Sequence, residues 1–412
     1  MRSIDIVQAG ILSLATVISA TTARAAPGLI PAACRESLKS DAVRCGTILV
    51  PENPGAPNAR TIALNVIVIG ARRPRAGAPP LFGLDGGPGI AATDGADFYL
   101  GPGGAYREWR DVVLFDQRGT GASNPLRCEA LEKRDPLQDM YSDRDVAACL
   151  AAIGKSADLS QYSSEVAADD IERVRLALGY EQIDIWALSY GTRLAQVYMK
   201  RHPASVHSVV LVGFVPLDYR APLYHAAAAQ RLIDLLFFKC QNDHECDARY
   251  PYLRREWQAV LKRLDKAPLT IAGKTIRRGP FAEAVRASLT TATAQRRLPS
   301  LIHAAVAGDF GPFLKSLPKD SSQFAEGAYL SIVCSESVAR IRSADVVPAT
   351  TGTFLGDYRV QQERAACAQW PSHEMSEESY IEPRPAAPIL VIAGEMDNVA
   401  PPDWGFEFCS AI

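Results

Sequence analysis

The chain of 412 residues is long enough for one large domain or two ordinary ones, and 48% hydrophobic with 22% charged residues is the composition of a globular protein. Its formal net charge of −2 is close to neutral, and no cluster of lysine and arginine departs from that balance. A protein that binds nucleic acid or another polyanion carries a basic patch, so this class is excluded.

Residues 1–25 have the pattern of a signal peptide. Arg2 gives a minimal basic start, residues 11–20 are largely apolar, and Ala23-Arg24-Ala25 fits a small-x-small cleavage site. The apolar run is too short to span a membrane, and no later stretch is long enough. A disordered tail would not need such a run. We therefore expect export, periplasmic or extracellular, after cleavage behind Ala25, with no membrane span.

All nine cysteines follow this segment, and several should pair in an oxidising compartment. No CxxC or Cys/His cluster has zinc-ligand spacing, so we expect no metal. Pairing each cysteine with its neighbour in the sequence gives one of many possible connectivities, and it leaves Cys409 without a partner. The suggested pairs are Cys34–Cys45, Cys128–Cys149, Cys240–Cys246 and Cys334–Cys367.

Short apolar runs of strand length recur through the first half of the chain. Ser164 is expected to cap a helix that ends near Leu178, with acidic residues in its first turn. Apolar strands that alternate with helices indicate a mostly parallel sheet with helices on both faces. The expected strands cover residues 61–69, 80–84, 112–115, 183–188 and 206–212.

From residue 216 onward the pattern becomes helical, with expected helices at 224–239, 252–264 and 297–307. A further buried-strand run, Ile389–Ile392, then follows. A helical block between two sheet strands indicates a lid over the carboxyl edge of the sheet, where ligands bind in such folds. The expected organisation is a signal peptide at 1–25, a core at 26–215, a helical lid at 216–387 and the last part of the core at 388–412.

Ser189 lies at the junction between the strand at 183–188 and an amphipathic helix. The sequence Ala187-Leu188-Ser189-Tyr190-Gly191 has small residues two before and two after the serine, as a nucleophile elbow requires. The amide of Tyr190 then points to where an oxyanion would form. The alternative is a chance serine in a turn, and Ala187 in place of the usual first glycine weakens the match.

Four motifs in this order resemble the α/β-hydrolase superfamily and, within it, the prolyl and tripeptidyl aminopeptidase family of serine exopeptidases. They are DGGPG at 85–89, DQRGTGAS at 116–123, ALSYGT at 187–192 followed by RHP at 201–203, and GEMDNVAPP at 394–402. The resemblance covers residues 45–402 and implies a lidded α/β-hydrolase fold. It implies acyl transfer from a peptide or small ester substrate, without a cofactor. No GxGxxG after a strand and no Walker loop is present.

The same resemblance implies roles for particular residues. Ser189 is the nucleophile, Asp397 the acid of the triad, and the amides of Tyr190 and of Gly87 or Gly86 the oxyanion donors. Glu336 matches acidic lid residues that bind a substrate's free amino group. The alternatives are a plain tight turn for the glycines, a surface turn for Asp397 and a solvated glutamate beside a disulfide for Glu336. Asp116 and Arg118 match a family motif, and we expect them to form an ion pair or turn.

The chain departs from the family pattern in its histidines. In this fold the catalytic histidine follows the acid, but all six histidines precede Asp397 and none is among the 15 residues after it. The sheet's last strand is also not found, which leaves its neighbour with an unpaired edge. Three interpretations follow: a hydrolase sequence truncated at its C-terminus and impaired, a non-catalytic secreted binding protein, or an esterase that uses a lid histidine.

Overall fold

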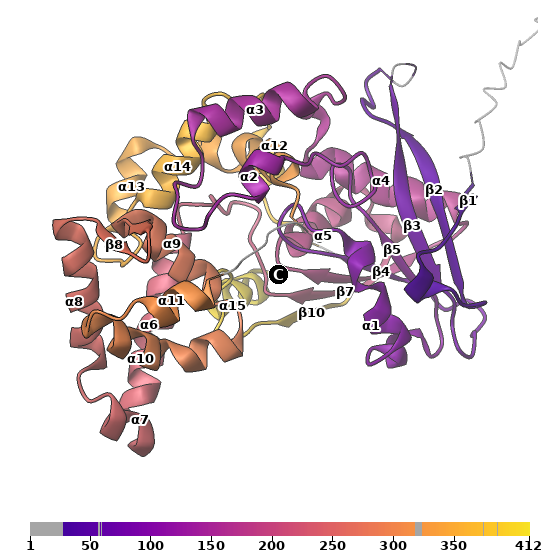
Figure 1. Cartoon of the computed structure of the whole chain (residues 1–412). Coiled ribbons are helices and arrows are strands. Elements are labelled where there is room, and N and C mark those ends of the chain that lie inside the picture. Colours follow the sequence, from indigo (N-terminus) through magenta and orange to yellow (C-terminus); the bar gives the residue numbers. More distant parts are fainter. Residues whose placement is uncertain (1–27, 57, 59, 318–323, 374, 385) are drawn as a thin grey trace, which may run out of the picture.

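The computed structural model describes residues 28–56, 58, 60–317, 324–373, 375–384 and 386–412. The signal peptide predicted at 1–25 lies outside the described residues. A twisted sheet occupies one side of the molecule, and a body of helices lies against the end of that sheet (Figure 1). Among the described residues, no helix is both long and apolar enough to cross a membrane.

The sheet has eight strands in the order β1-β2-β3-β5-β4-β6-β7-β10. The pairs from β1 to β5 are antiparallel, and the pairs from β5 to β10 are parallel. All the strands predicted from the sequence are present, while β1 and β2 were not predicted. The strand bounds are β1 Ile30–Ala32, β2 Val43–Pro51, β3 Thr61–Ile69, β4 Leu81–Leu84, β5 Val112–Phe115, β6 Ile183–Leu188, β7 Val206–Val212 and β10 Ile389–Ile392.

One face of the sheet is covered along its length. The helices α4 (Ser164–Ala177), α5 (Tyr190–Arg201) and α15 (Pro402–Ala411) pack there around the main apolar core. Ser163, not Ser164, caps α4, because its side chain accepts a hydrogen bond from the Val166 amide. The prediction of Ser164 as the cap was one residue out, and Ser164 is instead held in the first turn.

Fewer helices cover the opposite face of the sheet. The helix α1 (Ala96–Leu100) packs on it, and Tyr106 meets Trp186 of β6 with ring centroids 5.2 Å apart. Toward β10 the face is open, since Leu390 is 56% exposed and Ile392 41%. Within the described part of the chain, β10 is the edge strand and pairs only with β7.

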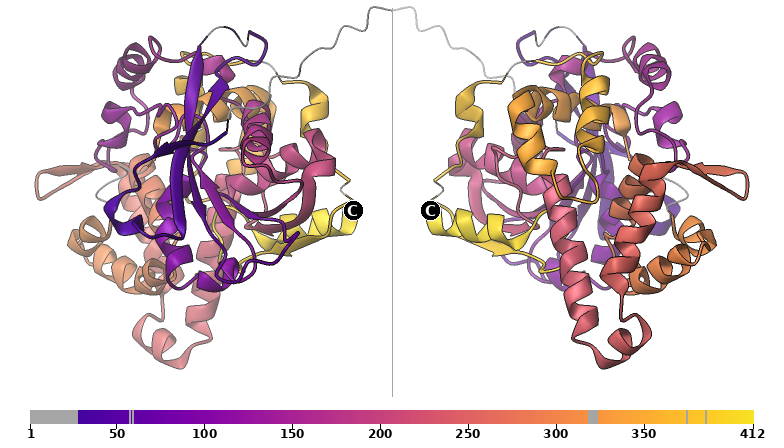
Figure 2. Two further views of the ribbon diagram at one scale, coloured as in Figure 1. Left: turned by 90° about the vertical axis from the view of Figure 1, so that its right-hand side faces the viewer. Right: turned by 90° about the vertical axis from the view of Figure 1, so that its left-hand side faces the viewer.

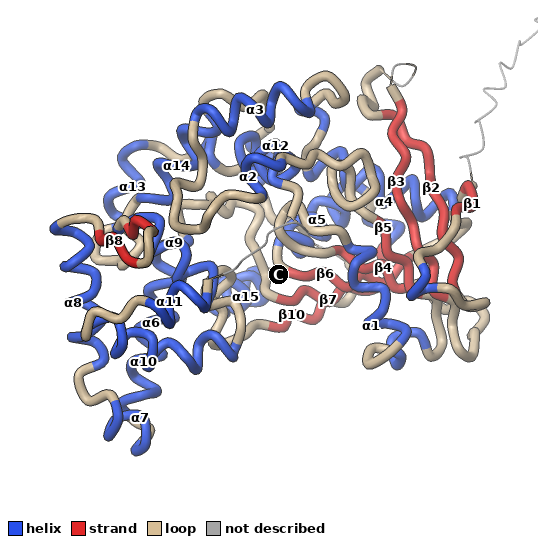
Figure 3. The backbone as a smooth tube through the Cα atoms, in the orientation of Figure 1, coloured by secondary structure: helices blue, strands red, loops and turns tan. Residues whose placement is uncertain are grey.

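Between β7 and β10 the chain is mainly helical, and these helices lie beyond the carboxyl ends of the parallel strands (Figures 1 and 3). Figure 2 shows α6 and α8 running side by side through this body. The helices are α6 His225–Gln241, α7 His244–Arg249, α8 Leu253–Lys266, α9 Arg278–Ser288, α10 Ala292–Val306, α11 Gly311–Ser316, α12 Glu326–Glu336, α13 Ser343–Thr350 and α14 Tyr358–Cys367. A short hairpin, β8 (Leu269–Ile271) and β9 (Lys274–Ile276), interrupts them.

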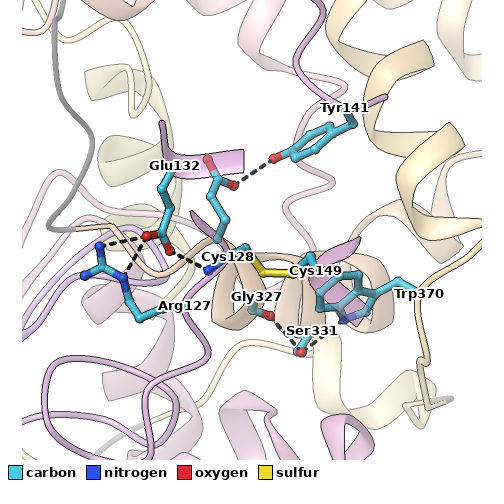
Figure 4. Close-up of a disulfide and its surroundings, with 9 residues drawn as sticks. Arg127, Cys128, Glu132, Tyr141, Cys149, Gly327, Ser331 and Trp370 are labelled. Carbon is cyan, nitrogen blue, oxygen red and sulfur yellow. Dashed lines mark hydrogen bonds and ion pairs between the residues drawn. A yellow bond between two sulfur atoms is a disulfide. The ribbon is translucent and has the colours of Figure 1, made fainter. Parts of the chain in front are cut away.

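The four disulfides suggested by sequence proximity are all formed, and Cys409 is exposed and free. Figure 4 shows the pair Cys128–Cys149, which joins the start of α2 (Glu129–Glu132) to α3 (Asp143–Ile153). Beside it, Ser331 of α12 donates to the Gly327 carbonyl and accepts from the Trp370 indole. This small core therefore fixes α12, one of the walls of the pocket described below.

Candidate active site

Ser189 occupies a sharp turn between β6 and α5. Its backbone has φ 53° and ψ −122°, a region that non-glycine residues rarely adopt. The turn is held by a hydrogen bond of 2.8 Å from the Ser189 amide to the Val212 carbonyl. A Cβ on Gly191 would lie 2.3 Å from the Leu84 carbonyl oxygen, so only glycine fits two residues after the serine. This is the geometry of a nucleophile elbow.

The glycine turn predicted at 85–89 lies directly against Ser189. A Cβ on Gly86 would lie 3.0 Å from the Ser189 Cβ. The Gly86 amide donates to Asp85 Oδ1 at 2.7 Å, whereas Gly87 lines the same pocket as Ser189. Burial raises the pKa of the Asp85 carboxyl, against the lowering effect of the Gly86 hydrogen bond. Of the two glycines named from the sequence, Gly87 is therefore the one that borders the pocket of Ser189, as Tyr190 also does.

Asp397 follows β10 and lies at the same end of the sheet as Ser189. Its Oδ1 accepts the amides of Val399 and Ala400 at 2.8 and 2.9 Å, which fixes the carboxylate. A Cβ on Gly213 would lie 3.5 Å from Asp397 Oδ2 and 4.0 Å from the Ser189 amide nitrogen. Asp397 and Ser189 thus both lie next to Gly213, which has φ 63°.

A pocket of about 50 Å³ opens beside Ser189. Its walls come from the glycine turn, from the start of α5, from the chain between β7 and α6, and from α12. Such a volume holds a small group and no large side chain. The lining residues are Gly87, Pro88, Ser189, Tyr190, Arg193, Val215, Tyr219, Ala221, His225, Tyr329, Ile332, Val333, Glu336, Ser337 and Val399.

Glu336 lines this pocket from α12 and is fully buried. Its carboxylate accepts from the Ser164 amide at 2.6 Å and from the Ser164 hydroxyl at 2.7 Å. Arg193 Nε, also buried, donates to it at 3.1 Å. The alternative of a solvated glutamate is wrong. The carboxylate is also neutralised by Arg193, which weakens its attraction for a second cation.

None of the six histidines, all of them described, forms a hydrogen bond with Ser189 or Asp397. Three are paired with other carboxylates: His202 with Asp169, His207 with Asp184, and His303 with Glu256. His225, the first residue of α6, is the histidine that lines the pocket of Ser189.

Asp116 and Arg118 have structural roles and do not pair with each other. The Asp116 carboxylate accepts hydrogen bonds from the Asn65 side chain, from the Thr93 amide and hydroxyl, and from the Ala122 amide. The Arg118 guanidinium makes a buried pair with Asp170 at 2.7 and 2.9 Å. The expectation of a structural role holds, with Asp170 as the unforeseen partner.

Sequence reasoning did not name Arg193 or Tyr219 as residues of the pocket, and its alternative of a lid histidine left open which one, His225 included, would lie there. For Arg193 the sequence held a signal, because it places a charged side chain four residues, about one helical turn, after Ser189. The structure then shows that the helix α5 is buried nearly all round at this point. Within the described residues, no group of three or more His, Cys, Asp or Glu side chains could hold a metal ion.

Comparison with known proteins agrees with this geometry. The family model described as alpha/beta hydrolase fold matches residues 107–405. The putative hydrolase YuaR of Escherichia coli is 28% identical over 55% of this chain and 48% of its own length. A probable proline iminopeptidase of Streptomyces coelicolor is 32% identical over 32% of each chain. A tripeptidyl aminopeptidase of Streptomyces lividans is 29% identical over 42% of this chain and 35% of its own.

The eight-stranded sheet and the sharp turn at Ser189 agree with this match, and the chain belongs to the alpha/beta hydrolase fold family. Several relatives are named as peptidases, among them the probable proline iminopeptidase, the serine protease Hip1 and the tripeptidyl aminopeptidase. The chain spans about half the length of YuaR and about a third of the lengths of the probable proline iminopeptidase and the tripeptidyl aminopeptidase. Among solved structures, a proline iminopeptidase of Mycobacterium smegmatis has a TM-score of 0.40 and 17% identity, over 89% of this chain and 87% of that one.

Proposed function

We propose that the protein is an exported serine hydrolase of the prolyl and tripeptidyl aminopeptidase type, which forms an acyl-enzyme at Ser189. The observation that carries this proposal is the positive φ of Ser189 at the β6–α5 turn, with Gly86 against it. A strained backbone at a half-buried serine that lines a pocket is a feature that clusters at active sites. The names of the aminopeptidase relatives support a peptide substrate, and the four disulfides support export.

In this reaction Ser189 Oγ bonds to the substrate carbonyl carbon, and the serine proton passes to a base. The bond from that carbon to the leaving amine or alcohol then breaks, and the leaving group takes up this proton, so that the acyl group stays on Ser189. The amides of Gly87 and Tyr190 stabilise the oxyanion, and each such donor is worth about 2.7–4 kcal/mol in measured cases. Asp397 holds the base in orientation.

We further propose that these 412 residues alone react slowly. No histidine follows Asp397, and no described histidine is bonded to Ser189. An oxyanion hole and binding without a base retain roughly 10³–10⁴-fold over water and lose the rest.

One observation bears on the alternative of an esterase with a lid histidine, because His225 lines the pocket. Burial, with Arg359 and Arg286, holds the pKa of His225 well below its usual value. A general base must become an imidazolium, and this environment opposes that charge. No carboxylate of the described residues is hydrogen-bonded to its ring. His225 therefore supports the esterase alternative poorly.

The test is labelling of the purified chain with a fluorophosphonate probe. We expect slow labelling that is absent in Ser189→Ala and unchanged in Ser300→Ala, an exposed serine of α10. Asp397→Asn should leave this base-free labelling nearly unchanged. No labelling of a folded protein would favour a binding protein. Rapid labelling would show that a base is assembled and overturn the proposal of slow reaction.

A further inference from the structure

Four buried side chains next to Ser189 form one hydrogen-bonded group, which we call the elbow network. The Tyr190 hydroxyl lies 2.8 Å from the Ser164 hydroxyl, which donates to the Glu336 carboxylate at 2.7 Å. This carboxylate also accepts from the Ser164 amide at 2.6 Å and from Arg193 Nε at 3.1 Å. All four residues are at most 5% exposed, so their polar groups depend on one another and not on bulk water.

The direction of each hydrogen bond in the elbow network follows from the groups present. A serine hydroxyl has one proton, and that of Ser164 is directed at the Glu336 carboxylate, which Arg193 holds as an ion pair. The Tyr190 hydroxyl is therefore the donor to Ser164. Burial raises the pKa of Tyr190 above its usual value, so this hydroxyl keeps the proton that it donates. The carboxylate thus orients both hydroxyls.

The elbow network joins segments that are far apart in sequence. Tyr190 and Arg193 lie in the first turn of α5. Ser164 begins α4, and Glu336 ends α12. The hydrogen bonds of Glu336 to Ser164 and Arg193 span 172 and 143 residues. Arg193 also donates to the Leu217 carbonyl, in the stretch between β7 and α6. The Glu336 carboxylate therefore ties the lid helix α12 to the elbow.

The elbow needs such a tie, because the backbone of Ser189 is strained. A φ of 53° persists only where the surrounding structure over-determines it. Tyr190 follows directly in the chain, and its amide is one of the two donors of the oxyanion hole in the proposed reaction. A Tyr190 side chain that is held at its hydroxyl restricts the first turn of α5, and it restricts this amide with it.

We propose that Glu336 is a positioning residue of the oxyanion hole, which acts through Ser164 and Tyr190 to fix the Tyr190 amide next to Ser189. This inference rests on the proposed acyl transfer at Ser189. It gives Glu336 a role other than binding a substrate's amino group, because its carboxylate already accepts three hydrogen bonds from the protein, one of them from a cation. It also makes the reactivity of Ser189 depend on the place of α12.

The test measures fluorophosphonate labelling of Ser189 at increasing probe concentrations, which separates the saturating rate from the half-saturating concentration. A misplaced oxyanion donor lowers the rate and leaves the concentration nearly unchanged, because it acts mainly in the transition state. We expect Tyr190→Phe and Ser164→Ala to lower the saturating rate about tenfold, a part of the roughly 10²–10³-fold that a whole donor supplies. A change in the half-saturating concentration alone would contradict the proposal.

The variant Glu336→Gln tests the carboxylate itself. An amide has one oxygen and one NH2 group, so in either orientation its NH2 faces an N–H of Ser164 or Arg193 that donates to Glu336 in the wild type. We expect a loss at least as large as that of Tyr190→Phe. Because the residues act as one unit, the double variant Tyr190→Phe/Glu336→Gln should lose no more than the larger single loss. Single losses that multiply would show that the two residues act independently and that the proposal is wrong.

Glu172 supplies the matched control, because its carboxylate also accepts from an arginine, a tyrosine hydroxyl and a serine hydroxyl. These partners are Arg175, Tyr198 and Ser205, and none of them lines the pocket of Ser189. Glu172→Gln and Tyr198→Phe should lower the stability in urea, as the variants of the elbow network do, and leave the labelling unchanged. Equal losses of labelling in both sets would mean a general loosening of the fold and no positioning role.

The same labelling separates this inference from the proposed function. If the folded wild type never labels, acyl transfer at Ser189 is wrong and the positioning role falls with it. If the wild type labels and the three single variants of the elbow network reach the same saturating rate, the positioning role alone is wrong. If Glu336→Gln labels normally but is no longer protected by Ala-Ala-Ala, while acetyl-Ala-Ala-Ala still protects it, Glu336 binds the substrate's amino group instead.

Discussion

At the scale of single residues, the elbow depends on the absence of one side chain at Gly191. A Cβ there would meet the Leu84 carbonyl at 2.3 Å, and this contact is with backbone that cannot rotate away. We expect Gly191→Ala to lower the free energy of unfolding by about 1–3 kcal/mol and to displace Ser189. Urea denaturation and fluorophosphonate labelling measure the two effects. Gly95→Ala, where a Cβ would meet nothing within 4 Å, is the control. Equal stability of both variants would contradict the close contact.

Another single residue, Glu283, makes stability depend on pH. Burial alone would raise its pKa, but Arg286 and Arg359 outweigh burial and lower the pKa to about 2. A carboxyl with a depressed pKa stabilises the fold above its unfolded value, and this contribution is lost as the pH falls from about 4.5 toward 2. The shift corresponds to about 3 kcal/mol.

The measurement for Glu283 is urea denaturation between pH 5 and pH 2. The stability advantage of the wild type over Glu283→Gln should shrink steadily across this range. Glu245→Gln, at an exposed position on α7, serves as the matched control and should show no such trend. A difference that is constant with pH would mean that Glu283 is not held ionised by its two arginines.

At the scale of elements, the sequence predicts what has a local pattern. The strands at 61–69, 112–115, 183–188, 206–212 and 389–392 were predicted at their observed bounds, because each is a short apolar run between turn residues. The helix α12 was not predicted. It is buried on every side, so it has no polar face and no helical period to detect.

The last two elements show how unequal the faces of the sheet are. Phe408 of α15 is 1% exposed and stacks on Phe214 with ring centroids 4.5 Å apart. We expect Phe408→Ala to cost about 3–5 kcal/mol of unfolding free energy. Leu390→Thr on the open face of β10 should change it by less than about 0.5 kcal/mol. Urea denaturation of both variants measures these two changes. A large loss of unfolding free energy in Leu390→Thr would show that this face is covered in solution.

At the scale of the whole molecule, the site joins parts that are far apart in sequence. Motifs located Ser189, Asp397 and the glycine turn, since their roles depend on local turns. The pairing of Arg193 with Glu336 spans 143 residues, and that of Arg118 with Asp170 spans 52. No local pattern reports such partners. The buried polar groups of Tyr219 and His225 that have no partner among the described residues are likewise visible only after folding has buried them.

None of the four described disulfides joins the sheet to the helical segment between β7 and β10. Cys334–Cys367 ties α12 to α14 across 33 residues, whereas Cys240–Cys246 closes only 6. In the chain-entropy model the longer loop contributes about 4 kcal/mol and the shorter about 2. We expect the double variant Cys334→Ala/Cys367→Ala to lose more stability in urea than Cys240→Ala/Cys246→Ala.

The larger loss should also reach the active site, because α12 carries Glu336 into the pocket of Ser189. The Cys334/Cys367 double variant should therefore label more slowly with fluorophosphonate at a urea concentration below its unfolding transition, while the Cys240/Cys246 variant labels as the wild type does. Equal losses in both variants would mean that loop length does not govern these crosslinks. Unchanged labelling would mean that α12 is held in place by its packing alone.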